Sequence, residues 1–153
     1  MLHTFNNSDG ANPYAGLVFD AAGNLYGTTQ GGGADNLRTV FKLTPSADGT
    51  WTESVLHTFN GNGPGVPLTG LIFDGAGNLY GTAWSGGSAN AGAAFKLSPN
   101  VDGSWAYSLL YVFQGNPALN LVGGLVLGGA GTLYGTTENC NSGCRGVVYQ
   151  ITP

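Results

Sequence analysis

The sequence predicts an all-β protein, and three observations support this class. Of its 153 residues, 28 are glycine and 7 are proline, so 35 positions together disfavour the interior of a helix. No longer stretch free of glycine and proline shows apolar residues at helical spacing, and short apolar runs alternate with turn residues instead. The apolar fraction of 42% is too high for a disordered chain.

The charge content is low and acidic. There are 4 Lys or Arg residues against 8 Asp or Glu, and the formal net charge is −4. Because a nucleic-acid partner requires a positive surface, nucleic acid is excluded as the expected partner. No apolar stretch reaches the roughly 18 residues of a membrane span. The opening residues Met1–Phe5 carry no secretory signal, and a processed protein would show the same.

The sequence repeats itself with a period of 54 residues. Gly-Asn-Leu-Tyr-Gly-Thr at Gly23–Thr28 returns at Gly77–Thr82 and, with Thr for Asn, at Gly131–Thr136. Aligning 2–55 with 56–109 gives 28 identities in 54 positions. We therefore expect a single domain spanning 1–153, built from three repeats at about 2–55, 56–109 and 110–153.

Each period contains four strand signals separated by turns. In the first repeat we expect strands at Gly16–Asp20, Leu25–Thr29, Thr39–Leu43 and Trp51–Phe59. Asp48-Gly49 is expected to form a two-residue hairpin turn with both residues at positive φ. Four short antiparallel strands per repeat describe the blade of a β-propeller, in which both faces of each sheet are buried.

The pattern G-L-x-F-D-x-x-G-N-L-Y-G-T-T at Gly16–Thr29, followed by V-F-K-L-x-P at Val40–Pro45, resembles the GloVer (Gloeo/Verruco) tandem repeat of bacterial surface and secreted proteins. It is also distantly similar to NHL-type propeller repeats. The resemblance covers essentially the whole chain and implies a repeat architecture without a defined activity. The third copy departs from the pattern at Gly128 and Thr132, where the first two copies have Asp and Asn. A ligand that requires this Asp-Asn pair in every blade is therefore not expected.

The strand order of the chain predicts self-assembly. Leu2–Phe5 matches a fourth strand with no blade before it, and the last repeat stops after its third strand. Three blades cannot close a ring, since propellers have about four to eight. We expect a homodimer with a six-bladed ring, in which Leu2–Phe5 of each chain completes the last blade of the other. A nine-bladed trimer, a filament and a piece of a longer natural array are the alternatives.

Cys140 and Cys144 are the two cysteines of the chain. A local disulfide is the expected state, and free thiols and a metal site are the alternatives. The metal site is the least favoured of the three, because zinc needs about four ligands and no His or acidic pair lies nearby in sequence. A disulfide implies an oxidising compartment, which agrees with a secreted or cell-surface location.

The sequence predicts no catalytic residue, no bound metal and no cofactor. His3 and His57 occupy one equivalent position, which favours packing or surface roles over catalysis. Asp20 and Asp74 precede Gly-Asn turns, and turn capping is favoured over calcium binding. A hydrolase or lyase is therefore the least favoured function.

Two functions from different classes remain. The first is a non-enzymatic structural or interaction module, because most repeated residues are glycine, aromatic or turn-forming. In this interpretation the repeated Trp51 and Trp105 are structural wedges. The second is a lectin-like binder with sites between blades. Its candidate residues are Trp84, which does not recur and could stack on a sugar, and the equivalent Glu138.

Overall fold

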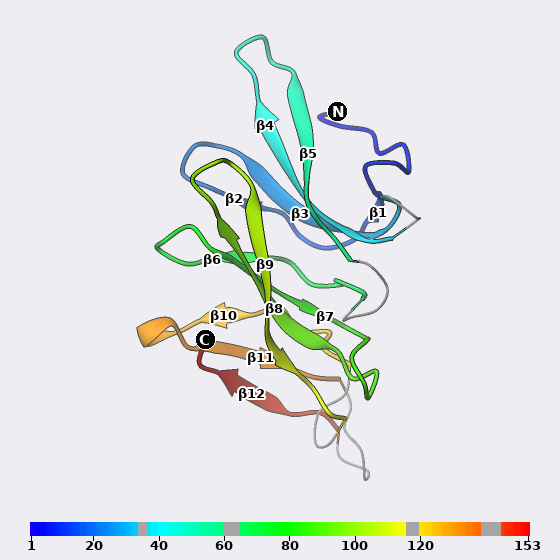
Figure 1. The fold of residues 1–153 in the computed structure, drawn as a ribbon, viewed down its shortest axis with the longest axis vertical. Helices are drawn as coiled ribbons and strands as arrows, with labels where there is room; N and C mark the ends of the chain where they lie inside the picture. The colour runs from blue at the N-terminus through cyan, green and yellow to red at the C-terminus, as the bar shows by residue number, and fades with distance from the viewer. Residues whose placement is uncertain (34–36, 60–64, 116–119, 139–144) are drawn as a thin grey trace.

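The computed structural model describes residues 1–33, 37–59, 65–115, 120–138 and 145–153. These residues form three antiparallel β-sheets, which follow one another along the long axis of the molecule (Figure 1). No α-helix occurs in this described part, which also contains no helix long and apolar enough to cross a membrane. The predicted all-β class is confirmed.

The strands follow the order expected from the repeat. The first sheet contains β1 (Ala11–Pro13), β2 (Val18–Phe19), β3 (Leu25–Gly31), β4 (Thr39–Pro45) and β5 (Trp51–Thr58). The second sheet contains β6 (Ile72–Phe73), β7 (Leu79–Ala83), β8 (Ala93–Pro99) and β9 (Trp105–Val112). The third contains β10 (Val126–Leu127), β11 (Leu133–Thr136) and β12 (Val148–Ile151), with a short 3₁₀ turn at Gly129–Gly131.

All three sheets share one hydrogen-bond register. The first two strands of the repeat pair through Val18 with Tyr26, Ile72 with Tyr80, and Val126 with Tyr134. The bulge between Val40 and Phe41 recurs between Ala94 and Phe95. Because every pair repeats at a step of 54 residues, the sequence repeat is also the structural repeat.

The glycine of each Leu-Tyr-Gly-Thr segment makes room for an aromatic ring. Gly27 lies opposite Phe41 in the ladder, and a Cβ placed on Gly27 would be 2.7 Å from Cζ of Phe41. The same holds at Gly81, where the distance to Cζ of Phe95 would be 2.6 Å. Such distances are far below van der Waals contact, so the ring packs against the backbone only because glycine is there.

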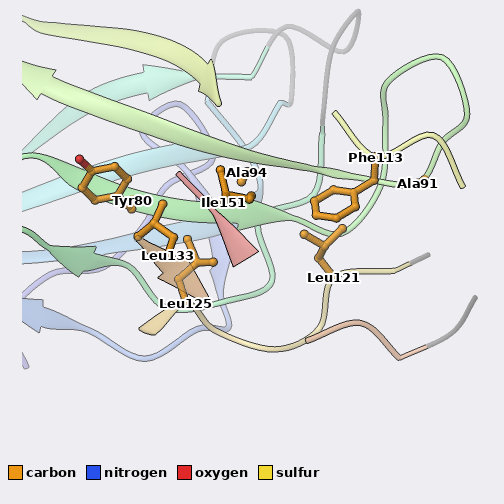
Figure 2. Close-up of a cluster of buried hydrophobic side chains, with 8 residues drawn as sticks. All are labelled: Tyr80, Ala91, Ala94, Phe113, Leu121, Leu125, Leu133 and Ile151. Carbon is orange, nitrogen blue, oxygen red and sulfur yellow. The ribbon is translucent and has the colours of Figure 1, made fainter. Parts of the chain in front are cut away.

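The hydrophobic core lies between the sheets. Tyr26 and Val40 of the first sheet pack with Leu79, Phe95 and Leu97 of the second. A matching cluster fills the space between the second and third sheets, where Figure 2 shows Leu125 and Leu133 beside Tyr80. A third, smaller cluster covers the outer side of the first sheet and contains Leu25, Phe41 and Leu43 with Phe5 and Trp51.

Strand β1 was not predicted. It pairs with the end of β3, with Ala11 opposite Gly31. The later repeats make a similar connection, because the Trp84 N–H donates to the Val66 carbonyl at 2.7 Å and the Glu138 N–H to the Asn120 carbonyl at 3.0 Å. The segment at the start of each repeat is rich in Gly, Pro and Asn, a composition typical of turns. It does not predict a strand, because this pairing uses backbone groups and needs no apolar side chains.

The predicted two-residue hairpin turn at Asp48-Gly49 is wrong. Pro45 pairs with Trp51, so the loop has five residues, 46–50. Gly49 has a φ of +84° and its N–H donates to the Ser46 carbonyl, whereas Asp48 is not among the residues with positive φ. A glycine at the fourth position of a type I turn explains this loop, and Asp48 accepts hydrogen bonds from Thr50 instead.

The predicted strand at Leu2–Phe5 is not formed within the single chain. Its expected neighbour, β12, lies near the opposite end of the molecule from the N-terminus (Figure 1). Phe5 nevertheless packs against Phe41, with ring centroids 5.0 Å apart. The segment therefore contacts the first sheet without a strand partner of its own.

Candidate functional site

A groove of about 600 Å³ opens between the first and second sheets. The turn from β2 to β3 and the turn from β8 to β9 both contribute to its rim. Phe19, Tyr26 and Lys42 line it from the first sheet, and Phe73 and Trp105 line it from the second. The groove is therefore a product of the stacking, because neither sheet forms it alone.

Three aromatic rings meet in this groove. Tyr26 makes edge contacts with Phe73 at 5.0 Å and with Trp105 at 5.9 Å between ring centroids. Tyr26 is buried, whereas Phe19 at the rim is 63% exposed. Edge-to-face pairs of this kind are favourable, so the two sheets hold their rings in a fixed arrangement beside an open space.

Asp20 caps the turn that borders the groove. Its Oδ1 accepts the N–H groups of Ala22 and Asn24, both at 2.9 Å. Its Oδ2 accepts the side-chain amide of Asn24 at 2.6 Å and the hydroxyl of Tyr26 at 2.9 Å. Asp74 makes the equivalent four bonds to Ala76, Asn78 and Tyr80. The favoured interpretation of these carboxylates as turn caps is confirmed.

These contacts shift the pKa values of both partners. Burial alone would raise the pKa of Asp20, but the hydrogen bonds from Asn24, Tyr26 and Ala22 outweigh it and lower the pKa below its ordinary value. Burial and the Asp74 carboxylate raise the pKa of Tyr80 to about 12. At neutral pH the carboxylates are ionised and their acceptor positions are occupied, so they are poorly suited to act as bases.

Lys42 on β4 and Lys96 on β8 occupy one equivalent position in the first two repeats. Each ammonium lies over the tyrosine of the neighbouring strand, with Lys42 Nζ 5.8 Å from the Tyr26 ring centroid and Lys96 Nζ 5.7 Å from that of Tyr80. These are cation–π contacts. Lys42 forms no ion pair with any residue that the structure describes, and its head group faces the groove wall.

The two histidines have packing roles, as favoured from the sequence. His57 stacks on Tyr107 at 3.9 Å with the rings nearly parallel, and burial lowers its pKa. His3 Nε2 lies 3.0 Å from Oδ2 of Asp9. Because His57 is held within the aromatic cluster between the sheets, it is not presented to a substrate.

The two candidate sugar-binding residues do not form one site. Trp84 and Glu138 occupy equivalent positions after β7 and β11, and each donates its backbone N–H to the entry segment of its own repeat. Trp84 is half-buried and Glu138 is exposed. Neither lines the groove between the first two sheets.

Cys140 and Cys144 lie outside the described residues. In the part of the chain that is described, no group of three or more His, Cys, Asp or Glu side chains is placed to hold a metal ion.

Sequence reasoning missed the groove because it assigned its residues separately. Trp105 was interpreted as a structural wedge, and Phe19 and Phe73 only as strand residues. Trp105 does pack with the cluster between the sheets, but it also borders open space. The sequence signal that could have revealed the groove was the repeat itself, since Phe19 and Phe73 occupy one equivalent position in adjacent repeats.

Comparison with known families places the chain in a repeat family. The model of the Gloeobacter/Verrucomicrobia repeat matches residues 1–153, in agreement with the resemblance noted from the motif. A comparison with curated proteins found no match.

Proposed function

The chain belongs to the Gloeobacter/Verrucomicrobia repeat family, and from this premise we propose that it is a non-enzymatic scaffold of β-propeller type. Each 54-residue repeat supplies one blade, and the blades associate through one recurring face-to-face interface. The observation that carries this proposal is that the chain uses the interface twice internally, whereas in the described part of the chain no sheet covers the forward half of the third sheet or the backward half of the first.

The interface has two complementary halves. The forward half is formed by Val18, Tyr26 and Val40, which pack against the backward half of the next sheet, represented by Leu71 and Leu79. The second and third sheets repeat this arrangement, with Tyr80 and Ala94 packed against Leu125 and Leu133. Both apolar halves are therefore required wherever two blades meet.

Among the described residues, no sheet packs against the forward half of the third sheet. Val126 is 66% exposed, Tyr134 41% and Val148 79%, although the corresponding Tyr26 and Val40 are buried. Three large apolar side chains on one sheet face favour a protein contact over exposure to water.

The first sheet presents the matching backward half, in which Leu25, Phe41 and Leu43 pack with Phe5 and Trp51 while Leu17 is left exposed. Leu17 is 53% exposed, whereas Leu71 and Leu125 at the same repeat position are 4% exposed. Beside Leu17 lies a hollow of about 300 Å³, lined also by Phe5, Phe41 and Leu43. In the internal interfaces this space is filled by the forward half of the preceding sheet.

The N-terminal segment supports the same arrangement. Phe5 contacts Phe41 at 5.0 Å, Phe59 contacts Phe95 at 5.4 Å, and Phe113 contacts Tyr149 at 4.9 Å. His3 lies against Phe5 as His57 lies against Phe59, at 4.8 and 4.9 Å. Phe5 therefore occupies the position that Phe59 and Phe113 take after β5 and β9. This position supports the proposal that Leu2–Phe5 becomes the fourth strand of a neighbouring blade in the assembled ring.

For residues 1–153 the covering partner is a second copy. Two copies with three sheets each make six blades, within the range of about four to eight that closed propellers have. In this ring Leu2–Phe5 of each copy pairs with β12 of the other. The exposed faces of the first and third sheets have to be covered by protein, whichever residues precede or follow 1–153. A secreted or cell-surface location accompanies the proposal, on the family resemblance.

Light scattering during size-exclusion chromatography tests the proposal. We expect a mass of twice the chain mass of 15.5 kDa. Val148→Asp places a carboxylate in the interface and should give the monomer, whereas Val101→Asp in the β8–β9 turn, where Val101 is fully exposed, should leave the dimer intact.

A wild-type mass that remains at 15.5 kDa up to high micromolar concentration would contradict the proposal. Species that grow continuously with concentration would replace the closed ring by an open stack, since a head-to-tail contact that does not close produces a filament.

A further inference from the structure

We propose that the groove between the first and second sheets binds a neutral saccharide, with a sugar ring against Phe73 and Trp105 and a hydroxyl accepting a hydrogen bond from Lys42. Its volume of about 600 Å³ lies within the range of about 300–1,000 Å³ of small-molecule sites. Both walls belong to one chain, so this binding does not depend on assembly into a ring.

The apolar component of the site comes from three strands. Phe19 on β2, Phe73 on β6 and Trp105 on β9 line the same groove, and none of the three is fully buried. The ring contacts to Tyr26 fix Phe73 and Trp105 from behind. Such rings provide large rigid contact surfaces, and the indole adds one N–H donor. The C–H face of a pyranose is complementary to a surface of this kind.

The polar component comes from Lys42. An ammonium has three donors and no acceptor, and the contact of Lys42 with the π face of Tyr26 leaves these donors available to a ligand. Tyr26 itself donates its hydroxyl to Asp20 at 2.9 Å, so its position under Lys42 is held by the turn. A sugar hydroxyl beside Lys42 would receive a charge-assisted hydrogen bond.

The charges of the groove favour a neutral ligand over a charged one. Asp20 and Asp74 line the groove together with Lys42. An anionic ligand would meet two carboxylates. A cationic ligand would meet the ammonium of Lys42 and would find the acceptor positions of both carboxylates already filled. A polyhydroxylated ring avoids both penalties, because it offers acceptors to Lys42 and adds no charge.

The space between the second and third sheets provides an internal control. Lys96 lies over Tyr80 as Lys42 lies over Tyr26. However, Leu127 stands where the first groove has Phe73, and Gly128 stands where it has Asp74. We therefore assign one such site to the described part of the chain, at Lys42 and not at Lys96.

Isothermal titration calorimetry tests the assignment with a panel of neutral mono- and disaccharides of glucose, galactose, mannose, fucose and N-acetylglucosamine. At least one sugar should bind the wild-type chain. Lys42→Ala should weaken that binding about tenfold, the loss expected for one charge-assisted hydrogen bond. Lys96→Ala is the matched control and should leave the affinity within about twofold, since it removes the same cation–π contact elsewhere.

A second pair of variants addresses the stacking surface. Trp105→Leu should reduce binding at least as strongly as Lys42→Ala, whereas Trp51→Leu changes the equivalent residue on the outer side of the first sheet and should not affect it. Circular dichroism melting of all four variants separates lost binding from lost folding. If Trp105→Leu unfolds, Lys42→Ala still decides the outcome.

Three results would overturn the proposal. The first is the absence of a measurable interaction with every sugar in the panel. The second is tighter binding of a charged probe, for which indole-3-acetate and choline serve as the anionic and cationic examples. The third is an equal effect of Lys42→Ala and Lys96→Ala, because the groove would then not be the site.

Discussion

The first and third sheets carry the same types of residue in their forward halves but differ completely in burial. Val40 is 0% exposed and the equivalent Val148 is 79% exposed, while Tyr26 is 3% and Tyr134 41% exposed. The residues and their registers match, so the difference comes from missing neighbours. Among the described residues, the third sheet has no sheet against this face and no fourth strand beside β12, where the first sheet has β5 beside β4. The comparison teaches that the apolar pattern of each repeat encodes an interface between sheets, and that a single repeat cannot bury its own core.

The same two sheets also differ in the turn between their first two strands. The first has the Asp20–Asn24–Tyr26 hydrogen bonds, and the third has Gly128 and a 3₁₀ turn with Ala130 at a φ of +56°. The strand register is nevertheless the same in both. Packing between strands therefore sets the register, and the turn network adds stability to a geometry that forms without it.

The largest expected effect is the difference in the free energy of unfolding between substitutions at Val40 and at Val148. Val40→Ala should lower the free energy of unfolding by about 2 kcal/mol, because it leaves a cavity between the first and second sheets. Val148→Ala in the dilute monomer should change it by less than about 0.5 kcal/mol, since an exposed side chain loses little burial. Urea denaturation monitored by circular dichroism measures both. Equal effects would show that the third sheet is covered within its own chain.

A smaller effect should distinguish the two kinds of turn. Asp74→Asn removes the charged acceptor of four hydrogen bonds and should cost about 1 kcal/mol at pH 7. The hydrogen bonds keep the pKa of Asp74 below its ordinary value in the folded state, so its contribution is complete above about pH 4 and is lost as the pH falls further. Denaturation at a series of pH values should show a shallower acid dependence for the variant. If the free energy of unfolding depended on acid pH equally in the variant and the wild type, the hydrogen bonds of this turn would not contribute to stability.

The smallest effect concerns the third turn and should change sign between repeats. Ala130 adopts a left-handed conformation with a φ of +56°, whereas the equivalent Ala76 is not among the residues with positive φ. Ala130→Gly should therefore stabilise the chain by about 0.5 kcal/mol, and Ala76→Gly should destabilise it by a similar amount. Thermal unfolding of the two variants side by side provides the measurement. Destabilisation by both would contradict the argument from φ, because the larger conformational freedom of glycine in the unfolded chain would then outweigh the relief at Ala130.

Much of the fold could be predicted from the sequence because its signals are local. Phe41 and Leu43 repeat at Phe95 and Leu97, and alternating strand and turn segments of this kind fix strand positions without knowledge of neighbours. Strand β1 was not predicted, because the backbone groups through which it pairs with β3 belong to a segment that contains Asn and Pro. The turn at Asp48 was assigned wrongly, because the dipeptide alone does not reveal the length of its loop.

The groove could not be predicted because it depends on two sheets at once. Phe19 and Trp105 are 86 positions apart in the sequence and meet only after the first two sheets stack. Trp84 was a candidate site residue because it does not recur in the other repeats, yet it is half-buried and does not line the groove. In a repeat protein, residues that recur can therefore line a site as well as hold the fold.

A mixing experiment tests the central claim most directly. Val148→Asp spoils the forward half of the interface and Leu17→Asp spoils the backward half, and each variant alone should give the 15.5 kDa monomer in light scattering. An equal mixture should form a complex of one copy of each, because the intact forward half of the Leu17→Asp chain can still bind the intact backward half of the Val148→Asp chain. A mixture that stays monomeric while the wild-type chain dimerises would contradict a head-to-tail interface between sheets.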